Sequence, residues 1–144
     1  MLVIDTSVAI KWVVPENGIG MEHDTAAALT LLSRGLLAPD LLLAEFGNVL
    51  WKKARKGEIT DMQAREAMRT LPEVVTVFPT RPYVVRALEI SLTLDHPMYD
   101  CVFVALAESR DTKLVTADRR LITRCEKTEF ASLITGLETE ASQH

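Results

Sequence analysis

The sequence predicts an α/β domain built around a parallel sheet. Short apolar runs alternate along the chain with longer segments of helical composition, which is the order of strands and helices in such domains. The runs Leu2–Ile4 and Leu36–Ala38 are apolar at every position, as in strands that are covered on both faces. The length of 144 residues is that of one domain, which we expect over residues 1–135, followed by a polar C-terminal tail over 136–144.

The first half of the chain contains residues that typically start and end helices. Ser7 is a favoured N-cap type, and Pro15 ends the helix that follows it. The polar, glycine-rich residues 16–20 predict a loop. Gly35 is placed to end the second helix and Asp40 to cap the third. The expected elements are a strand over Leu2–Ile4, helices over Val8–Val14 and Met21–Arg34, a strand over Leu36–Ala38 and a helix over Leu41–Lys56.

The second half follows the same alternation. Thr60 is an N-cap type, and Pro72 is expected to close the helix that it starts. Pro97 opens a very apolar helix, and Asp118 caps the last one. The expected elements are a helix over Asp61–Leu71, a strand over Val74–Phe78, helices over Arg81–Leu94 and Met98–Ser109, a strand over Lys113–Ala117, a helix over Arg119–Arg124, a strand over Phe130–Ile134 and a loose tail from Gly136.

The composition limits the classes of function. The net charge is −4 and the pI about 5.4, whereas a protein that binds nucleic acid by charge alone is normally basic. No apolar run reaches the roughly 18 residues of a membrane span, and Asp5 interrupts the first apolar stretch, so we expect a cytoplasmic protein without a signal peptide. The two cysteines, Cys101 and Cys125, lack the spacing of a zinc site, and a disulfide between them stays an alternative to buried thiols.

Two aspartates follow predicted strands. Asp5 ends the first strand, and Asp118 directly follows the strand over Lys113–Ala117. Ligands of open α/β sheets bind at the carboxyl ends of the strands, so both acids point into one crevice if these strands are neighbours. Taken singly, Asp5 is equally explained as a turn residue, and Asp118 is more simply explained as a helix N-cap.

Two further acids lie in apolar helices. Glu45 is surrounded by the apolar residues 41–46 and lies on or beside the apolar stripe, where an unpaired carboxylate is costly. A buried ion pair with Lys or Arg is the alternative explanation. Asn48 lies one turn on and is placed to orient Glu45. Asp100 is in the first turn of the most apolar helix, where the helix dipole favours an acid by only about 0.3–1 kcal/mol.

The four acids together indicate a metal site. Two carboxylates about 5 Å apart repel by roughly 3 kcal/mol at an effective dielectric constant near 20, so four converging acids require a countercharge. Hard divalent cations such as Mg²⁺ or Mn²⁺ bind oxygen ligands and also bind phosphate. The set Asp5, Glu45, Asp100 and Asp118 therefore suits metal-assisted hydrolysis of phosphodiesters.

The sequence resembles the PIN-domain ribonucleases, and among them the VapC-type toxins of toxin–antitoxin modules. The resemblance runs from Met1 to about Leu133. It rests on four stretches in order: Val3–Ser7, Leu43–Leu50, His96–Cys101 continuing into Ala105–Glu108, and Val115–Leu121.

The resemblance implies a three-layer α/β/α fold with a five-stranded parallel sheet, and an endoribonuclease that cleaves RNA with metal-activated water. By position, Asp5, Glu45, Asp100 and Asp118 match the acidic quartet of the family, which serves as metal ligands and catalytic residues. Thr6 and Thr116 match hydroxyl positions beside these acids. Many members are toxins that bind a small antitoxin and pair as homodimers, so the resemblance implies both partners here.

Several other polar residues near the acids are candidates for RNA binding. Lys11, Lys52 and Arg119 each lie downstream of a proposed ligand, where they could hold phosphates, but for any one of them a solvated helix face is the simpler explanation. Trp12 and Trp51 suit base stacking or, alternatively, packing.

His96, one turn before Asp100, is either a proton shuttle or a loop histidine with a capping hydrogen bond.

Other functional classes fit less well. An aspartate-nucleophile phosphatase needs a second Asp two residues after the first, where this chain has Ser7, and a receiver domain needs an acid pair near the N-terminus. Within the resemblance, a housekeeping RNA-processing nuclease and a non-catalytic RNA- or protein-binding module of the same fold remain alternatives to a toxin.

Overall fold

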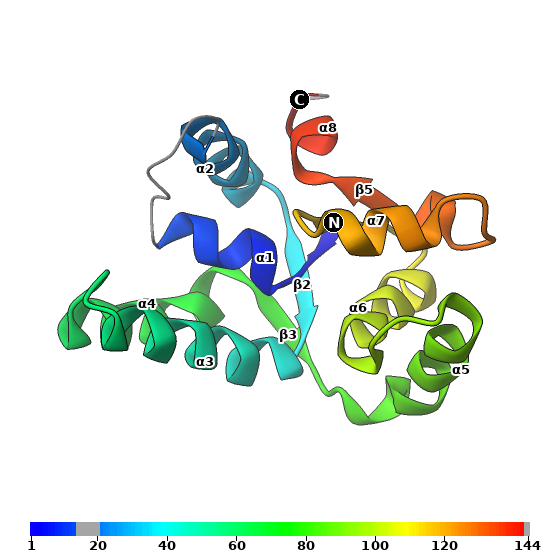
Figure 1. Cartoon of the computed structure of the whole chain (residues 1–144), viewed down its shortest axis with the longest axis horizontal. Helices are drawn as coiled ribbons and strands as arrows, with labels where there is room; N and C mark the ends of the chain where they lie inside the picture. The colour runs from blue at the N-terminus through cyan, green and yellow to red at the C-terminus, as the bar shows by residue number, and fades with distance from the viewer. Residues whose placement is uncertain (14–20, 143–144) are drawn as a thin grey trace.

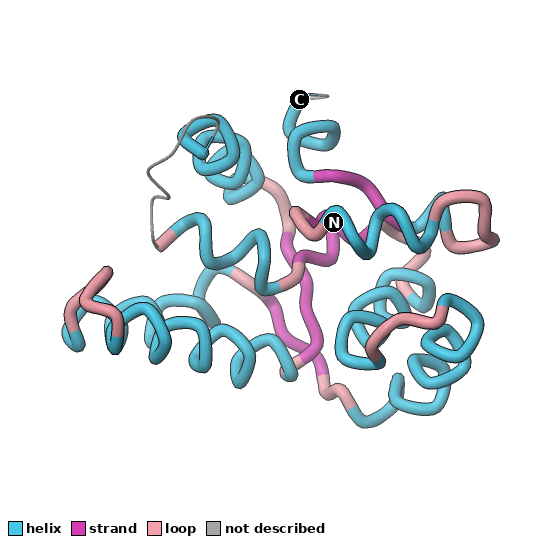
Figure 2. The backbone as a smooth tube through the Cα atoms, in the orientation of Figure 1, coloured by secondary structure: helices cyan, strands magenta, loops and turns pink. Residues whose placement is uncertain are grey.

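The computed structural model describes residues 1–13 and 21–142 and has a five-stranded, all-parallel sheet with helices on both faces. This confirms the predicted α/β class and the three-layer, five-stranded form (Figures 1 and 2). The strand order is β3-β2-β1-β4-β5, which places β1 at the centre. The strands are β1 Leu2–Ile4, β2 Leu36–Pro39, β3 Thr76–Phe78, β4 Leu114–Thr116 and β5 Ile134–Gly136.

The helices form the two outer layers. In Figure 1, α1, α3 and α4 lie on one side of the sheet and α5, α6 and α7 on the other. The helices are α1 Thr6–Ala9, α2 Met21–Thr30, α3 Leu41–Arg55, α4 Asp61–Val74, α5 Val84–Leu94, α6 Met98–Ser109, α7 Arg119–Cys125 and α8 Leu137–Ser142, with short 3₁₀ turns over Ile10–Trp12, Leu31–Ser33, Arg81–Tyr83 and Ala131–Leu133.

The central strand and helix α6 lie in the middle of the hydrophobic core. Val3 and Ile4 of β1 are completely buried, and in α6 all residues from Cys101 to Ala107 are buried. A helix that is apolar on nearly every face is stable only inside the protein, so the prediction of a central helix is confirmed. Cys101 and Cys125 are both buried free thiols, so the alternative of a disulfide is wrong.

The register of the sheet aligns the ends of its two central strands. Val3 pairs with Leu114 and Ile4 with Val115, in parallel. The next residue along each strand, Asp5 on one and Thr116 on the other, therefore lies at the same carboxyl edge. This edge is where ligands of open parallel sheets bind.

Helix caps differ from expectation at two positions. The first helix begins at Thr6, and its N-cap is Asp5, whose side chain accepts from Val8 N, so Ser7 is not the cap. Asp40 stands at the N-cap of α3, but its side chain makes no capping bond there. Instead Thr80, which follows β3, supplies the oxygen that accepts from Leu41 N at 3.0 Å.

Three expected boundaries are also wrong. Pro72 lies inside α4, which continues to Val74, because a proline near a helix end removes a single backbone hydrogen bond. The last strand covers Ile134–Gly136 instead of Phe130–Ile134. The described part of the expected loose tail is ordered, since α8 follows β5 and buries Leu137.

The expected loop over residues 16–20 and the end of the first helix at Val14 fall outside the described residues. Within residues 1–13 and 21–142, no helix has the length and apolar character that a membrane crossing requires.

Removal of the Thr80 hydroxyl should destabilise the fold through α3. In Thr80→Ala, Leu41 N loses its acceptor and Asp40 Oδ1 loses the donor now at 2.6 Å, so we expect a loss of about 1 kcal/mol in the free energy of unfolding. Thr93→Ala is the control, because this exposed hydroxyl bonds only to Glu89 O within its own helix. Urea titration should show a change within about 0.5 kcal/mol for the control. Equal effects of the two substitutions would contradict the capping role.

Candidate functional site

The structure brings the four predicted acids together at the carboxyl edge of the sheet. They line one pocket, of about 260 Å³, which we call the acidic pocket. Asp5 follows β1, Glu45 is in the second turn of α3, Asp100 is in the first turn of α6, and Asp118 is the N-cap of α7. The residues that line it are Asp5, Thr6, Ser7, Glu45, Asn48, Val49, Asp100 and Asp118.

Asp5 is held by a hydrogen-bond network between the two central strands. Ser7 Oγ accepts from Ala117 N at 2.9 Å, and Thr116 Oγ1 accepts from Asp118 N at 3.0 Å. A backbone amide can only donate, so each hydroxyl keeps its own proton to give away. Both protons go to Asp5, from Ser7 Oγ to Oδ1 and from Thr116 Oγ1 to Oδ2, each at 2.5 Å. Both oxygens of Asp5 are thus acceptors, as an ionised carboxylate requires.

Burial opposes this ionisation. Asp5 is buried, and loss of solvation raises its pKa from 3.8 to about 6, against the hydrogen bonds from Ser7 and Thr116, which lower it. The negative charge of Asp100 raises the pKa of Asp5 further. A buried anion with a raised pKa and no positive side chain beside it in the pocket is a position that a cation would stabilise.

Glu45 is also a carboxyl group whose pKa is raised by burial, although it is less buried than Asp5. It is half-buried, and desolvation raises its pKa, as does the charge of Asp100, whereas a hydrogen bond from Thr6 lowers it. Thr6 Oγ1 donates to Glu45 Oε1 at 3.0 Å. No Lys or Arg of the described chain forms an ion pair with Glu45, so the alternative of a buried ion pair is not supported.

Asp118 fits both of its interpretations at once. Its Oδ1 accepts from Arg120 N at 2.9 Å and from Leu121 N at 3.4 Å, which is N-cap geometry. Its side chain also lines the acidic pocket, because the start of α7 lies at the edge of the sheet. Capping occupies one carboxylate oxygen only, so capping and ligand binding do not exclude each other.

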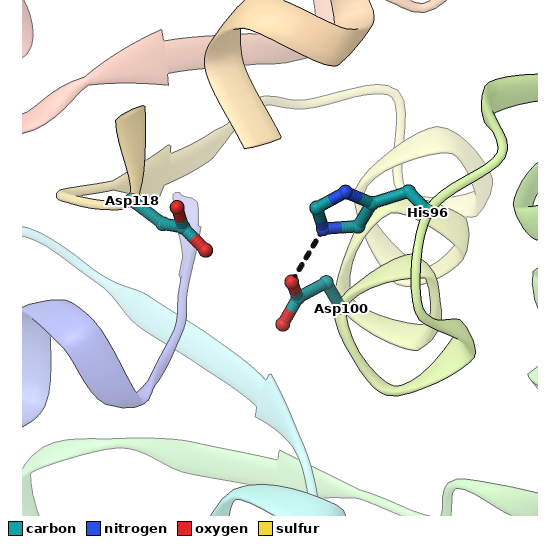
Figure 3. A group of neighbouring side chains, drawn as sticks. All are labelled: His96, Asp100 and Asp118. Carbon is teal, nitrogen blue, oxygen red and sulfur yellow. Dashed lines mark hydrogen bonds and ion pairs between the residues drawn. The ribbon is translucent and has the colours of Figure 1, made fainter. Parts of the chain in front are cut away.

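A histidine joins the acids. One side-chain ligand atom from each of His96, Asp100 and Asp118 lies within 4.8 Å of the others. Figure 3 shows the imidazole of His96 directed at Asp100, with Asp118 facing the same space. The donor set of this region is therefore mainly carboxylate oxygen, the type of ligand that Mg²⁺ and Mn²⁺ bind.

The supporting residues predicted beside the acids lie at the site. Thr6 and Asn48 line the acidic pocket, and Thr116 is buried beneath it with its hydroxyl on Asp5. The sequence predicts Ser7 only as a helix cap, because its contacts with Asp5 and Ala117 N depend on the pairing of β1 with β4.

The predicted RNA-binding residues lie outside the acidic pocket. Lys11 is buried, so we do not retain it as a phosphate contact. Lys52 is exposed on α3, and Arg119 lines a neighbouring pocket of about 340 Å³ together with Thr116 and Ala117. Trp12 is half-buried and its Nε1 donates to Ala28 O at 2.7 Å, so it packs in the protein.

Comparison with known proteins identifies the family. The model of the PIN domain family matches residues 2–127. The chain belongs to the PIN domain family. Ribonuclease VapC1 of Mycobacterium tuberculosis is 38% identical over 103 residues, which are 65% of this chain and 75% of that protein. Ribonuclease VapC3 of Pyrobaculum aerophilum is 33% identical over 137 residues, which are 93% of this chain and 98% of that protein.

Solved structures agree with the PIN fold. PAE2754 from Pyrobaculum aerophilum superposes with a TM-score of 0.72 at 24% identity, over 99% of this chain and 87% of that one. VapBC2 from Rickettsia felis, solved bound to a DNA fragment from its promoter, gives a TM-score of 0.61 at 9% identity, over 94% of this chain and 97% of that one. At these identities the likeness concerns the fold.

The raised pKa of Asp5 predicts a pH-dependent stability of the metal-free protein. A carboxyl whose folded pKa lies above its unfolded value binds more protons when folded, so its contribution to stability falls as pH rises from about 4 to 7. In EDTA, the free energy of unfolding of the wild type, relative to Asp5→Asn, should therefore be about 1 kcal/mol higher at pH 5 than at pH 7. Denaturant titrations at both pH values measure it, and a difference that does not change with pH would contradict the shift.

Proposed function

We propose that this PIN-domain protein is a metal-dependent endoribonuclease of the VapC type, the toxin of a toxin–antitoxin pair. The observation that carries the proposal is the meeting of Asp5, Glu45, Asp100 and Asp118 in one pocket at the carboxyl edge of the sheet. The relatives named above are ribonucleases, which supports RNA as the substrate. Cleavage of RNA places the enzyme in the cytoplasm within this proposal.

The donor set of the acidic pocket fits Mg²⁺ or Mn²⁺. Its lining is rich in carboxylate oxygen and includes no Lys or Arg among the described residues, and burial raises the pKa of two of its acids. We assign Asp5, Glu45, Asp100 and Asp118 as the residues that hold the cation. When bound, a divalent cation supplies positive charge for the phosphate and makes water a stronger nucleophile.

The chain's own residues prepare the site for such a substrate. Ser7 and Thr116 fix the orientation of Asp5 from beneath, and Thr6 fixes Glu45 from the side. Preoriented carboxylates lose little conformational entropy when a cation binds between them. Asn48, exposed on the rim one turn after Glu45, is placed to donate to a phosphate or a ribose oxygen of RNA.

An apolar groove on the face of α3 and α4 is our candidate for the antitoxin contact. Its volume is about 370 Å³, and its lining includes Trp12, Leu32, Phe46, Leu71 and Val74. Leu32 and Val74 are exposed and line the groove together with the buried Phe46 and Leu71, so the groove offers continuous apolar surface to a partner. The likeness to the VapBC2 structure supports an antitoxin as this partner.

A second apolar surface supports a homodimer. Val85, Leu88 and Leu92 are exposed on α5 at spacings of three and four residues, so they form one stripe along the outer helix. A two-fold axis would bring this stripe against its own copy, because the same patch then contacts itself.

Cleavage of RNA tests the enzymatic proposal. Purified protein should cleave single-stranded RNA with Mg²⁺ or Mn²⁺ and not with EDTA. Asp100→Asn should lower the rate by orders of magnitude, because one ligand charge is lost while the side chain keeps its shape. Asp61→Asn is the control, since Asp61 is likewise an acid in the first turn of a helix, α4, but is exposed and lies outside the acidic pocket.

Thermal melting of the same variants shows whether Asp100 is a metal ligand or only stabilises the helix dipole. Mn²⁺ should raise the melting temperature of the wild type and of Asp61→Asn, and raise that of Asp100→Asn less, because the cation binds the folded site. Activity that persists in EDTA, or an unchanged Mn²⁺ response of Asp100→Asn, would contradict the assignment.

Sedimentation equilibrium tests the homodimer. The wild type should be a dimer at micromolar concentration, and Leu88→Glu should be a monomer, because a charge in the centre of the stripe cannot be desolvated without a partner. Met62→Glu likewise replaces an exposed apolar side chain by a charged one, but on α4, and this variant should remain a dimer. A wild type that is monomeric at all concentrations would exclude the α5 interface.

A further inference from the structure

His96 is held firmly at the junction of α5 and α6. Its side chain is only 3% exposed. Asp95 before it adopts the left-handed conformation, with φ 54°, that ends α5. Ser91 binds the backbone of His96 twice, because its carbonyl accepts from His96 N at 3.3 Å and its hydroxyl donates to His96 O at 2.5 Å. The position of the imidazole is therefore set by the fold before any ligand binds.

The imidazole contacts one of the four acids. His96 Nε2 lies 2.6 Å from Asp100 Oδ2, as the dashed line in Figure 3 marks. With the Asp100 carboxylate as the acceptor, the donor in this contact is the N–H of Nε2. A nitrogen that donates its N–H to Asp100 has no free lone pair for a metal ion. Nε2 of His96 is therefore occupied by Asp100 and is not free to bind a cation.

The hydrogen bond to His96 is the contact that fixes the side chain of Asp100. Its side chain is about one third exposed, at 32%, and the bond to His96 is its only side-chain hydrogen bond among the described residues. Asp5 and Glu45, by contrast, are tied by Ser7, Thr116 and Thr6. The charge of Asp100 raises the pKa of both Asp5 and Glu45, so the three acids repel one another before a cation arrives.

This repulsion acts on the least constrained member of the set. A carboxylate in the first turn of a helix can reach solvent by rotation about χ1, which would remove it from the acidic pocket. The hydrogen bond to the buried imidazole opposes that rotation, because it holds Oδ2 and leaves Oδ1 to the pocket.

We propose that His96 is a positioning residue that holds the Asp100 carboxylate in the acidic pocket and thereby raises the affinity of the protein for a divalent cation. The role of the pocket as a cation site rests on the proposed function, whereas the contact itself does not. Partners that orient metal ligands in this way contribute about 10- to 100-fold to metal affinity in other proteins.

Three substitutions test the N–H donor. The amide nitrogen of Gln reaches about as far from the backbone as Nε2 of His, whereas that of Asn is one methylene shorter. Titration calorimetry with Mn²⁺ should give His96→Gln an affinity within a few-fold of the wild type. His96→Asn and His96→Ala should bind Mn²⁺ about 10- to 100-fold more weakly. High Mn²⁺ concentration should restore cleavage by these two variants, because all four acids are still present.

Asp95→Asn is the control for the loop. It removes the neighbouring charge, and Asn tolerates the left-handed conformation, so Mn²⁺ affinity should not change. Circular dichroism checks that each variant is folded. If His96→Ala does not fold, the comparison of His96→Gln with His96→Asn still shows whether a donor at the position of Nε2 raises Mn²⁺ affinity. Both of these variants keep a polar side chain.

Three results would overturn the proposal. The first is wild-type Mn²⁺ affinity in His96→Asn and His96→Ala. The second is binding by His96→Gln as weak as that by His96→Ala, which a metal bound to the imidazole lone pair would produce. The third is a wild type that binds no Mn²⁺. A wild type that binds Mn²⁺ with the expected order of variants but cleaves no RNA would instead contradict the nuclease function and leave the positioning role intact.

Discussion

The burial of one carboxylate between two strands is the constraint on which the rest of the site depends. Asp5 lies at the end of the central strand, where desolvation disfavours its charged form. The hydroxyls of Ser7 and Thr116 each donate a hydrogen bond to one of its carboxylate oxygens. Those hydroxyls in turn accept from Ala117 N and Asp118 N, so the network also fixes the backbone after β4. The position of the Asp118 cap, and with it the start of α7, follows from how Asp5 is bound.

The fold and the four acids were predictable from the sequence because their signals are local. Apolar runs that end at an acid give both the strand and its carboxyl edge, as at Asp5, and an acid within an apolar helix is conspicuous, as at Glu45. Adjacent strands then bring such residues together by topology alone. To predict a five-stranded parallel sheet, the family resemblance was needed as well, because short apolar runs do not indicate which strands pair with each other.

The features that the sequence did not predict depend on contacts between distant segments. Ser7 looks like a cap, and only the pairing of β1 with β4 shows that it binds Asp5 and Ala117 N. Thr80, which follows the neighbouring strand β3, caps α3, although Asp40 stands at the usual position. The C-terminal residues are polar on average, yet Leu137 is buried and Glu140 pairs with Arg34 at 2.8 Å, a contact over 106 residues. Composition cannot show such contacts.

The acids of the acidic pocket are held by hydrogen-bond donors and not by basic side chains. A folded protein normally balances buried acids with Lys or Arg, and the lining of the acidic pocket contains neither. The described chain provides hydroxyl donors and one imidazole nitrogen instead. Hydroxyl donors orient the carboxylates but leave their negative charge uncompensated. Under the proposed function, a divalent cation would supply that missing positive charge. A lysine in the same place would stabilise the empty protein and compete with the cation for the same oxygens.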